Sequence, residues 1–182
     1  MRTELALIAA PTAIQPGGYV NKAYADRVQP KLATAVLETD FARGRGYKIT
    51  LGWQCDSAVN DIRQDTNLFP DACALLVPVN ENSPWITMGD EHNPVEGVLW
   101  RADKSEPYKI EAHGLGSVVR SSAPQGWAIS ADWKNKSWQV SFTLPQWAAL
   151  EKWQKLAVAV WLGGEKERAG LKSISQGWVS VA

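Results

Sequence analysis

Two segments of the chain alternate between large apolar residues and polar or small residues, and this alternation constrains the fold more than any other feature. They are residues 46–53, GYKITLGW, and residues 137–144, SWQVSFTL. A period of two places every second side chain on the same face, so each segment predicts a half-buried β-strand. The positions expected to be buried are Tyr47, Ile49, Leu51, Trp53, Trp138, Val140, Phe142 and Leu144.

Two short, continuously apolar runs predict central strands that are covered on both faces. They are residues 72–79, ACALLVPV, and residues 156–162, LAVAVWL. Many short strands separated by turn-rich segments predict an all-β fold, an antiparallel sandwich or barrel with one or two short helices. The remaining strand candidates are residues 34–39, 95–103, 107–113, 126–132 and 176–181.

The best helix candidate is LPQWAALEKW at residues 144–153, with Pro145 in the first turn. Before the strand at 137–144, the residues DWKNK supply a hairpin turn. No shift in composition divides the chain, so we expect one domain over residues 1–182. Within it, residues 1–32 are expected to be an irregular segment that wraps the sandwich or contacts a partner.

The charge balance and hydropathy of the chain exclude several partner classes. Nineteen Lys and Arg residues balance nineteen Asp and Glu residues, so no net field attracts the chain to nucleic acid or to an anionic membrane. No apolar run approaches the roughly 20 residues that cross a bilayer. The segment ELALIAAP is too short for a complete signal peptide, so we expect a soluble chain from which a targeting segment has been removed.

The residues that usually carry catalysis are scarce. No G-x-S-x-G, H-E-x-x-H, Walker or Rossmann pattern occurs, and His92 and His113 are expected to face solvent or to form hydrogen bonds. Cys55 and Cys73 form no C-x-x-C motif, which excludes covalent c-type haem and a zinc ribbon. A disulfide between them is one alternative; otherwise Cys73 is a small buried residue and Cys55 is exposed and open to intermolecular pairing.

Ten tryptophans admit two binding interpretations beside core packing, a platform for sugars or the walls of a flat cofactor pocket. Met88, the only internal methionine, lies in a Gly-Asp turn between two strand patterns, and Lys172 lies in AGLKSIS. Residue type alone predicts that Met88 is a core or loop residue and that Lys172 is a surface residue. A thioether and a deprotonated amine can nevertheless each donate a lone pair to haem iron, and burial favours the neutral lysine.

The motifs TMGDEHNPVEGVLWRAD (87–103) and AVAVWLGGEKERAGLKSISQGW (157–178) resemble the haem b-binding gamma subunits of periplasmic type II molybdoenzymes of the dimethyl sulfoxide reductase family. These are the small subunits of ethylbenzene dehydrogenase, dimethyl sulfide dehydrogenase, selenate reductase and chlorate reductase. The resemblance covers roughly residues 33 to 182. It implies an antiparallel β-sandwich related to the sugar-binding and DOMON-type haem domains, which holds one non-covalent haem b toward one end.

The resemblance also implies the residues of the site. A methionine and a lysine are the axial haem ligands of that family, and the matching positions are Met88 and Lys172. Lys166 and Lys155 are the local competitors of Lys172, which alone sits in the matching motif. Gly89 and Gly170 are expected to relieve crowding beside the ligands, with the Asn93–Pro94 turn shaping the methionine loop. By charge type, Arg120 and Arg168 are candidate partners of the haem propionates. Cys55 stands where relatives often carry an acidic residue.

The function implied is that of a non-catalytic electron-transfer subunit. Such a chain relays single electrons between a periplasmic cytochrome c-type carrier and the iron-sulfur beta subunit of a molybdenum oxidoreductase whose alpha subunit holds molybdopterin. Chlorate reductase is the expected enzyme. Two alternatives remain open: a carbohydrate-binding module on the same sandwich, and a periplasmic haem sensor or carrier with an open axial position.

Overall fold

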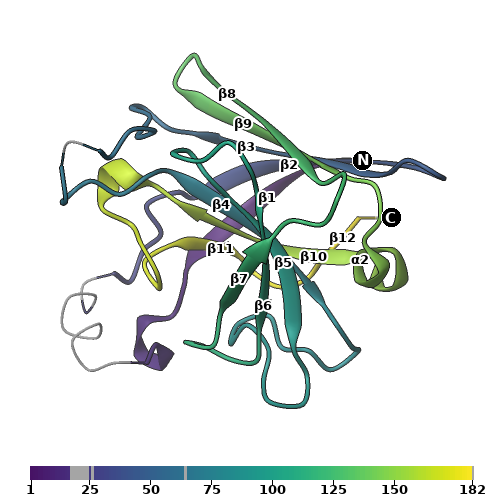
Figure 1. Ribbon diagram of the computed structural model, residues 1–182. Helices are drawn as coiled ribbons and strands as arrows, with labels where there is room; N and C mark the ends of the chain where they lie inside the picture. Colours follow the sequence, from purple (N-terminus) through teal and green to yellow (C-terminus); the bar gives the residue numbers. More distant parts are fainter. Residues whose placement is uncertain (17–24, 26, 64, 182) are drawn as a thin grey trace.

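The computed structural model describes residues 1–16, 25, 27–63 and 65–181, and within them strands dominate (Figure 1). The strands are β1 (Arg2–Ala9), β2 (Thr34–Ala42), β3 (Gly46–Gln54), β4 (Ala72–Pro78), β5 (Val95–Arg101), β6 (Tyr108–Ala112), β7 (Val119–Ser122), β8 (Ala128–Lys134), β9 (Ser137–Leu144), β10 (Lys155–Trp161), β11 (Ser173–Ser175) and β12 (Val179–Ser180). One α-helix, α2 (Ala148–Trp153), and two 3-10 turns, η1 (Thr12–Ile14) and η2 (Gly163–Glu165), complete the described elements.

The strands form one curled antiparallel sheet in the order β7-β6-β5-β4-β10-β11-β1-β2-β3-β9-β8, with β12 paired to β10. The sheet folds over at β1, because residues 2–6 of this strand pair with β2 whereas residues 7–9 pair with β11. This creates two layers. In Figure 1 the upper layer holds β2, β3, β8 and β9, and the lower layer holds β4 to β7, β10 and β11. The predicted all-β sandwich is therefore confirmed.

The main core lies between the two layers and is built from the alternating segments. On β3, Tyr47, Ile49, Leu51 and Trp53 are all buried. Their partners on β9 share the same face because directly opposite residues in an antiparallel pair point the same way, as Trp53 and Trp138 do. From the lower layer, Cys73, Leu75, Val77, Val98, Trp100, Val158 and Val160 complete this core.

The two continuously apolar runs are the central strands β4 and β10, as expected. A second apolar cluster covers the outer face of the lower layer, opposite the main core. Because both faces of these strands are covered, neither shows the polar alternation of a half-exposed strand. The outer cluster contains Ala74, Leu76, Val95, Leu99, Ile110, Ala112, Ala157, Ala159 and Ile174, with Met88 and Trp161 packed against it.

Several local expectations differ from the structure. The first 32 residues are not irregular throughout, because β1 occupies Arg2–Ala9 and joins the two layers. The helix is shorter than expected: it begins at Ala148, so Pro145 precedes its first turn. The hairpin turn before β9 is confirmed at Asn135 and Lys136, both with positive φ.

Cys55 and Cys73 are free thiols, so the disulfide alternative is wrong, and so is the expected exposure of Cys55. Cys55 is only 4% exposed, and its thiol contacts the carboxylate of Asp71 at 3.5 Å. Burial and the Asp71 charge raise the pKa of Cys55 to about 12, which keeps the thiol protonated and unreactive. Cys73 is fully buried, as expected.

No helix in the described part of the chain is long and apolar enough to cross a membrane.

Candidate functional site

The outer face of the lower layer carries small side chains at its centre. Strand pairing aligns Ala74 of β4 with Leu99 of β5 on one side and with Ala159 of β10 on the other. The next row along aligns Leu76 with Gly97 and Ala157. Since paired residues point to the same face, these rows form a flat apolar floor with little side-chain height at its centre.

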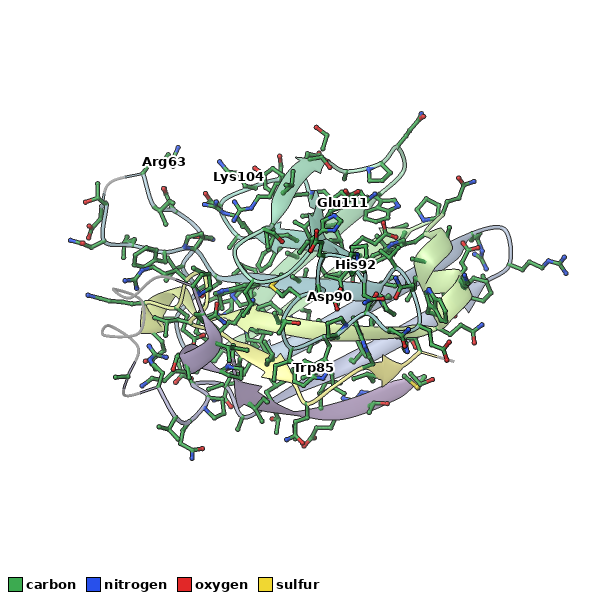
Figure 2. All side chains as sticks on the ribbon, turned by 90° about the horizontal axis from the view of Figure 1, so that it is seen from below. Arg63, Trp85, Asp90, His92, Lys104 and Glu111 are labelled. Carbon is green, nitrogen blue, oxygen red and sulfur yellow. The ribbon has the colours of Figure 1, made fainter. Side chains whose placement is uncertain are left out.

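The loop between β4 and β5 lies against this floor and presents Met88. In Figure 2 the labelled His92, Asp90 and Trp85 of this loop lie one below the other in the middle of the view, beneath Glu111 of β6. Backbone hydrogen bonds hold the methionine turn: Met88 N–H donates to Trp85 O at 3.2 Å, and Gly114 N–H donates to Met88 O at 3.0 Å. The second bond attaches the loop to the end of β6.

The backbone at Met88 is in the left-handed region, with φ of 57°, which costs a non-glycine residue free energy. Gly89 follows with φ of 83°, and a Cβ there would lie 2.9 Å from both Ala112 O and Asn93 O. The expected relief of crowding by Gly89 therefore has a structural basis. Asp90 stabilises the same loop, since its carboxylate accepts hydrogen bonds from the backbone of His92 and from Asn93.

Lys172 lies in a different loop from Met88, the one between β10 and β11. Ala10 N–H donates to Lys172 O at 3.0 Å, which fixes the residue beside the end of β1. The indole of Trp161 donates to Ala169 O at 3.0 Å, and the Lys172 amine lies 5.0 Å from the centre of that ring. At Gly170, a Cβ would meet the Gln15 side chain at 2.8 Å, so the crowding there comes from a side chain.

Glu167 holds the lysine loop internally. It is only 2% exposed; its carboxylate accepts a hydrogen bond from Leu162 N–H at 2.9 Å and forms an ion pair with Arg27 at 3.1 Å. Burial raises the pKa of Glu167 to about 7, although Arg27 opposes this. Residue type alone gave no signal for this carboxylate, because its role depends on contacts 140 positions apart in sequence.

Met88 and Lys172, 84 positions apart, meet over the floor. The Lys172 amine donates to the Met88 thioether sulfur across 3.6 Å. Burial lowers the pKa of Lys172 to about 8, since removal from water disfavours the ammonium form. The structure thus brings together a sulfur lone pair and an amine that loses its proton more readily than an ordinary lysine.

A cavity of about 470 Å³ lies beside the pair, within the range typical of cofactor pockets. The floor residues Ala72, Ala74, Leu76, Leu99, Ile110 and Ala159 line it together with Met88 and Lys172. Gln15 and Pro16 contribute from the N-terminal segment. Three arginines also line it: Arg120 and Arg168, which charge type suggested, and Arg101, which sequence reasoning missed.

The other residues considered from the sequence lie elsewhere. Lys166 is exposed at the end of η2, and Lys155 lies at the start of β10 beside Trp153. His92 and His113 are both exposed, in agreement with the solvent-facing expectation. Among the described residues, no group of three or more His, Cys, Asp or Glu side chains is placed to hold a metal ion.

Comparison with known proteins gives two similar sequences, while no family model matches the chain. A haem subunit assigned to a respiratory nitrate reductase of Haloferax mediterranei is 30% identical over an alignment of 186 positions, which covers 93% of this chain and 61% of that protein. Chlorate reductase subunit gamma of Ideonella dechloratans is 30% identical over 157 residues, 80% of this chain and 64% of that protein. The chain spans less than two thirds of the length of both relatives. The two matches confirm the resemblance of this chain to the gamma subunits of molybdoenzymes.

Proposed function

We propose that this chain is a haem-binding electron-transfer subunit of an oxidoreductase complex. The observation that carries the proposal is the meeting of Met88 and Lys172 at 3.6 Å above a floor of alanines. The two similar proteins are named as a haem subunit and a gamma subunit of reductases, which supports the same reading. A bound haem would supply one-electron redox chemistry at its iron.

The residues of the cavity fit such a group. A porphyrin is mainly apolar, and the cavity is lined mainly by apolar residues, among them alanines whose small side chains leave space for a ring. The cavity has donors of two kinds that iron accepts, the thioether of Met88 and the amine of Lys172. The lowered pKa of Lys172 reduces the free energy needed to reach the neutral amine, the form that has a lone pair to donate.

In this proposal Met88 and Lys172 are the two axial ligands of one non-covalent haem b. A bound haem would take the thioether of Met88 and the amine of Lys172 as iron ligands in place of their contact with each other. With both residues bound to iron, a haem would leave no open position for substrate or oxygen, and the chain would carry electrons without being catalytic itself. The soft methionine ligand favours the ferrous state and raises the reduction potential.

The wider role follows by analogy with the gamma subunits that the motifs resemble. The chain passes electrons between a cytochrome c-type carrier in the periplasm and the iron-sulfur beta subunit of a molybdenum enzyme. We favour chlorate reductase as that enzyme, since a chlorate reductase gamma subunit is one of the two similar proteins.

A carbohydrate-binding module gains no support from the tryptophans. Of the ten, only Trp133 is substantially exposed, at 40%, and its indole N–H donates to Cys55 O. A sugar platform needs several aromatic faces open to solvent, whereas here Trp53, Trp100, Trp127, Trp138 and Trp147 are buried in the main core.

The visible spectrum of the purified protein tests the function. We expect a Soret band from haem that acid-acetone extracts, a one-electron redox titration, and no binding of carbon monoxide by the ferrous protein. A colourless protein that takes up no haem contradicts the proposal. A haem protein that binds carbon monoxide readily supports the sensor or carrier alternative instead.

A further inference from the structure

The charges around the cavity are unequal. Arg101, Arg120, Arg168 and Lys172 line it, and the only acidic residue among its described lining residues is Glu167. Arg27 already pairs with this carboxylate. A largely apolar cavity with such a rim favours a ligand that is itself mainly apolar but carries negative charge.

Two of the three arginines are already occupied by other groups. The Arg101 guanidinium forms two parallel hydrogen bonds of 3.0 Å with the carboxylate of Asp103. Arg168 donates to Lys166 O at 2.8 Å, and its guanidinium lies 4.5 Å from the centre of the Phe69 ring. Each of these guanidinium groups therefore has part of its five N–H donors engaged within the protein.

Arg120 differs from both. Strand pairing places it opposite Ile110, which is opposite Gly97, so its side chain is on the same face as the cavity floor. It lies on β7, the edge strand of the lower layer, where its side chain is exposed. No hydrogen bond or ion pair of the Arg120 guanidinium occurs within the described part of the chain.

We infer that Arg120 is the residue that binds the carboxylate side chains of the cofactor, at the β7 edge of the cavity. This inference rests on the proposed haem function and adds the residue that recognises the anionic end of the ligand. A guanidinium binds a carboxylate through two parallel N–H donors, which supplies orientation as well as affinity. The carboxylates would then lie at the exposed edge, and the apolar part of the ring would lie inside the cavity.

The experiment titrates the full-length apoprotein with haem and, separately, with haem dimethyl ester, whose carboxylates are blocked. In the wild type, haem should bind about tenfold more tightly than the ester, the scale of one partly exposed charge-assisted pair. Arg120→Gln should weaken haem binding about tenfold and leave binding of the ester unchanged. Arg120→Lys should retain part of the preference, because the charge remains but the paired donors are lost.

Two matched variants make the result specific. Lys166→Gln removes one positive charge from an exposed residue that does not line the cavity, and it should leave both affinities unchanged. Arg168→Gln should leave the ratio of haem to ester affinity intact. Equal weakening of haem and ester by Arg120→Gln overturns the inference, and so does loss of the preference in Arg168→Gln instead.

Failure of this inference is distinguishable from failure of the proposed function. If the wild type binds haem and the ester equally well with the same low-spin spectrum, Arg120 recognises no carboxylate, yet the haem function stands. If neither compound binds, the haem function itself fails and takes the inference with it.

Discussion

The two faces of the lower layer are built from the same strands, but the inner face is closely packed whereas the outer face borders a cavity. On the inner face, Leu75, Val77 and Val160 are fully buried against side chains of the upper layer. On the outer face, Ala74 and Ala159 lie beneath two loops and border a cavity of about 470 Å³. Branched side chains fill one face completely, whereas alanines leave space on the other.

The difference shows how alternation along a strand can separate stability from binding. Because neighbouring residues point to opposite faces, a substitution at an odd or an even position of β4 or β10 affects only one of them directly. The inner face should set the free energy of unfolding, and the outer face should set the affinity for the cofactor. The following predictions test this separation.

The largest effect is expected on the inner face. Leu75→Ala should lower the free energy of unfolding by about 2–5 kcal/mol, because it leaves a cavity in a close-packed core. Denaturant unfolding of the apoprotein measures this loss. The folded holo-protein should keep its wild-type visible spectrum; a changed spectrum would show that the two faces are coupled.

On the outer face, a larger side chain in the cavity floor should weaken cofactor binding and leave the free energy of unfolding nearly unchanged. Ala159→Phe should weaken cofactor binding more than about 100-fold, equivalent to roughly 2.7 kcal/mol, since the ring occupies space the cofactor needs. The free energy of unfolding should change little, because the added ring projects into a cavity. Ala159→Ser is the matched control and should bind normally. Normal haem titration of the phenylalanine variant would place the cofactor elsewhere.

The buried amine of Lys172 should lower the free energy of unfolding of the apoprotein. Its lowered pKa of about 8 means that the unfolded chain holds the proton more tightly, so the penalty is full below pH 8 and fades as the pH rises toward 10.5. Lys172→Met should stabilise the apoprotein at pH 7 by roughly 1–2 kcal/mol, less than the roughly 3 kcal/mol of the full difference because the side chain keeps some solvent contact.

Unfolding curves of both proteins at several pH values measure this effect. The advantage of the Lys172→Met variant should shrink between pH 8 and pH 10. An advantage that does not depend on pH would mean that packing, and not the charge of the amine, causes it.

The smallest effect is expected at the methionine loop. Gly89→Ala should cost about 1 kcal/mol more than Gly44→Ala, because both glycines have φ near 80° but only Gly89 is crowded by backbone oxygens. Gly44 has open space around it and is the matched control. Thermal unfolding compares the two variants. Equal losses would show that the loop yields easily and does not hold Met88 rigidly.

Much of the fold could be predicted from the sequence, because period two and short apolar runs report burial directly. The short or exposed strands β7 and β11 were missed: β11 has three residues, and all four residues of β7 are exposed. β1 was also missed, although its residues Leu5 and Leu7 are buried. Its role of joining two layers depends on pairing with residues more than 160 positions away.

The candidate site could be predicted only in part. The motifs indicated Met88 and Lys172, but composition and spacing alone could not, since tertiary structure decides which residues meet across 84 positions. The alanine floor was visible in the sequence as two apolar runs, yet its meaning required the strand register. Arg101, Gln15 and Glu167 carried no signal, because their roles depend on contacts between distant segments.

The most direct measurement of the central claim is the visible spectrum of the holo-protein in three single variants. Met88→Ala and Lys172→Ala should each lose the six-coordinate low-spin spectrum and gain the ability to bind carbon monoxide, because each removes one axial ligand. Lys166→Ala should be indistinguishable from the wild type, because Lys166 is exposed outside the cavity. An unchanged low-spin spectrum in Lys172→Ala would contradict the assignment of this pair as the ligands of the haem.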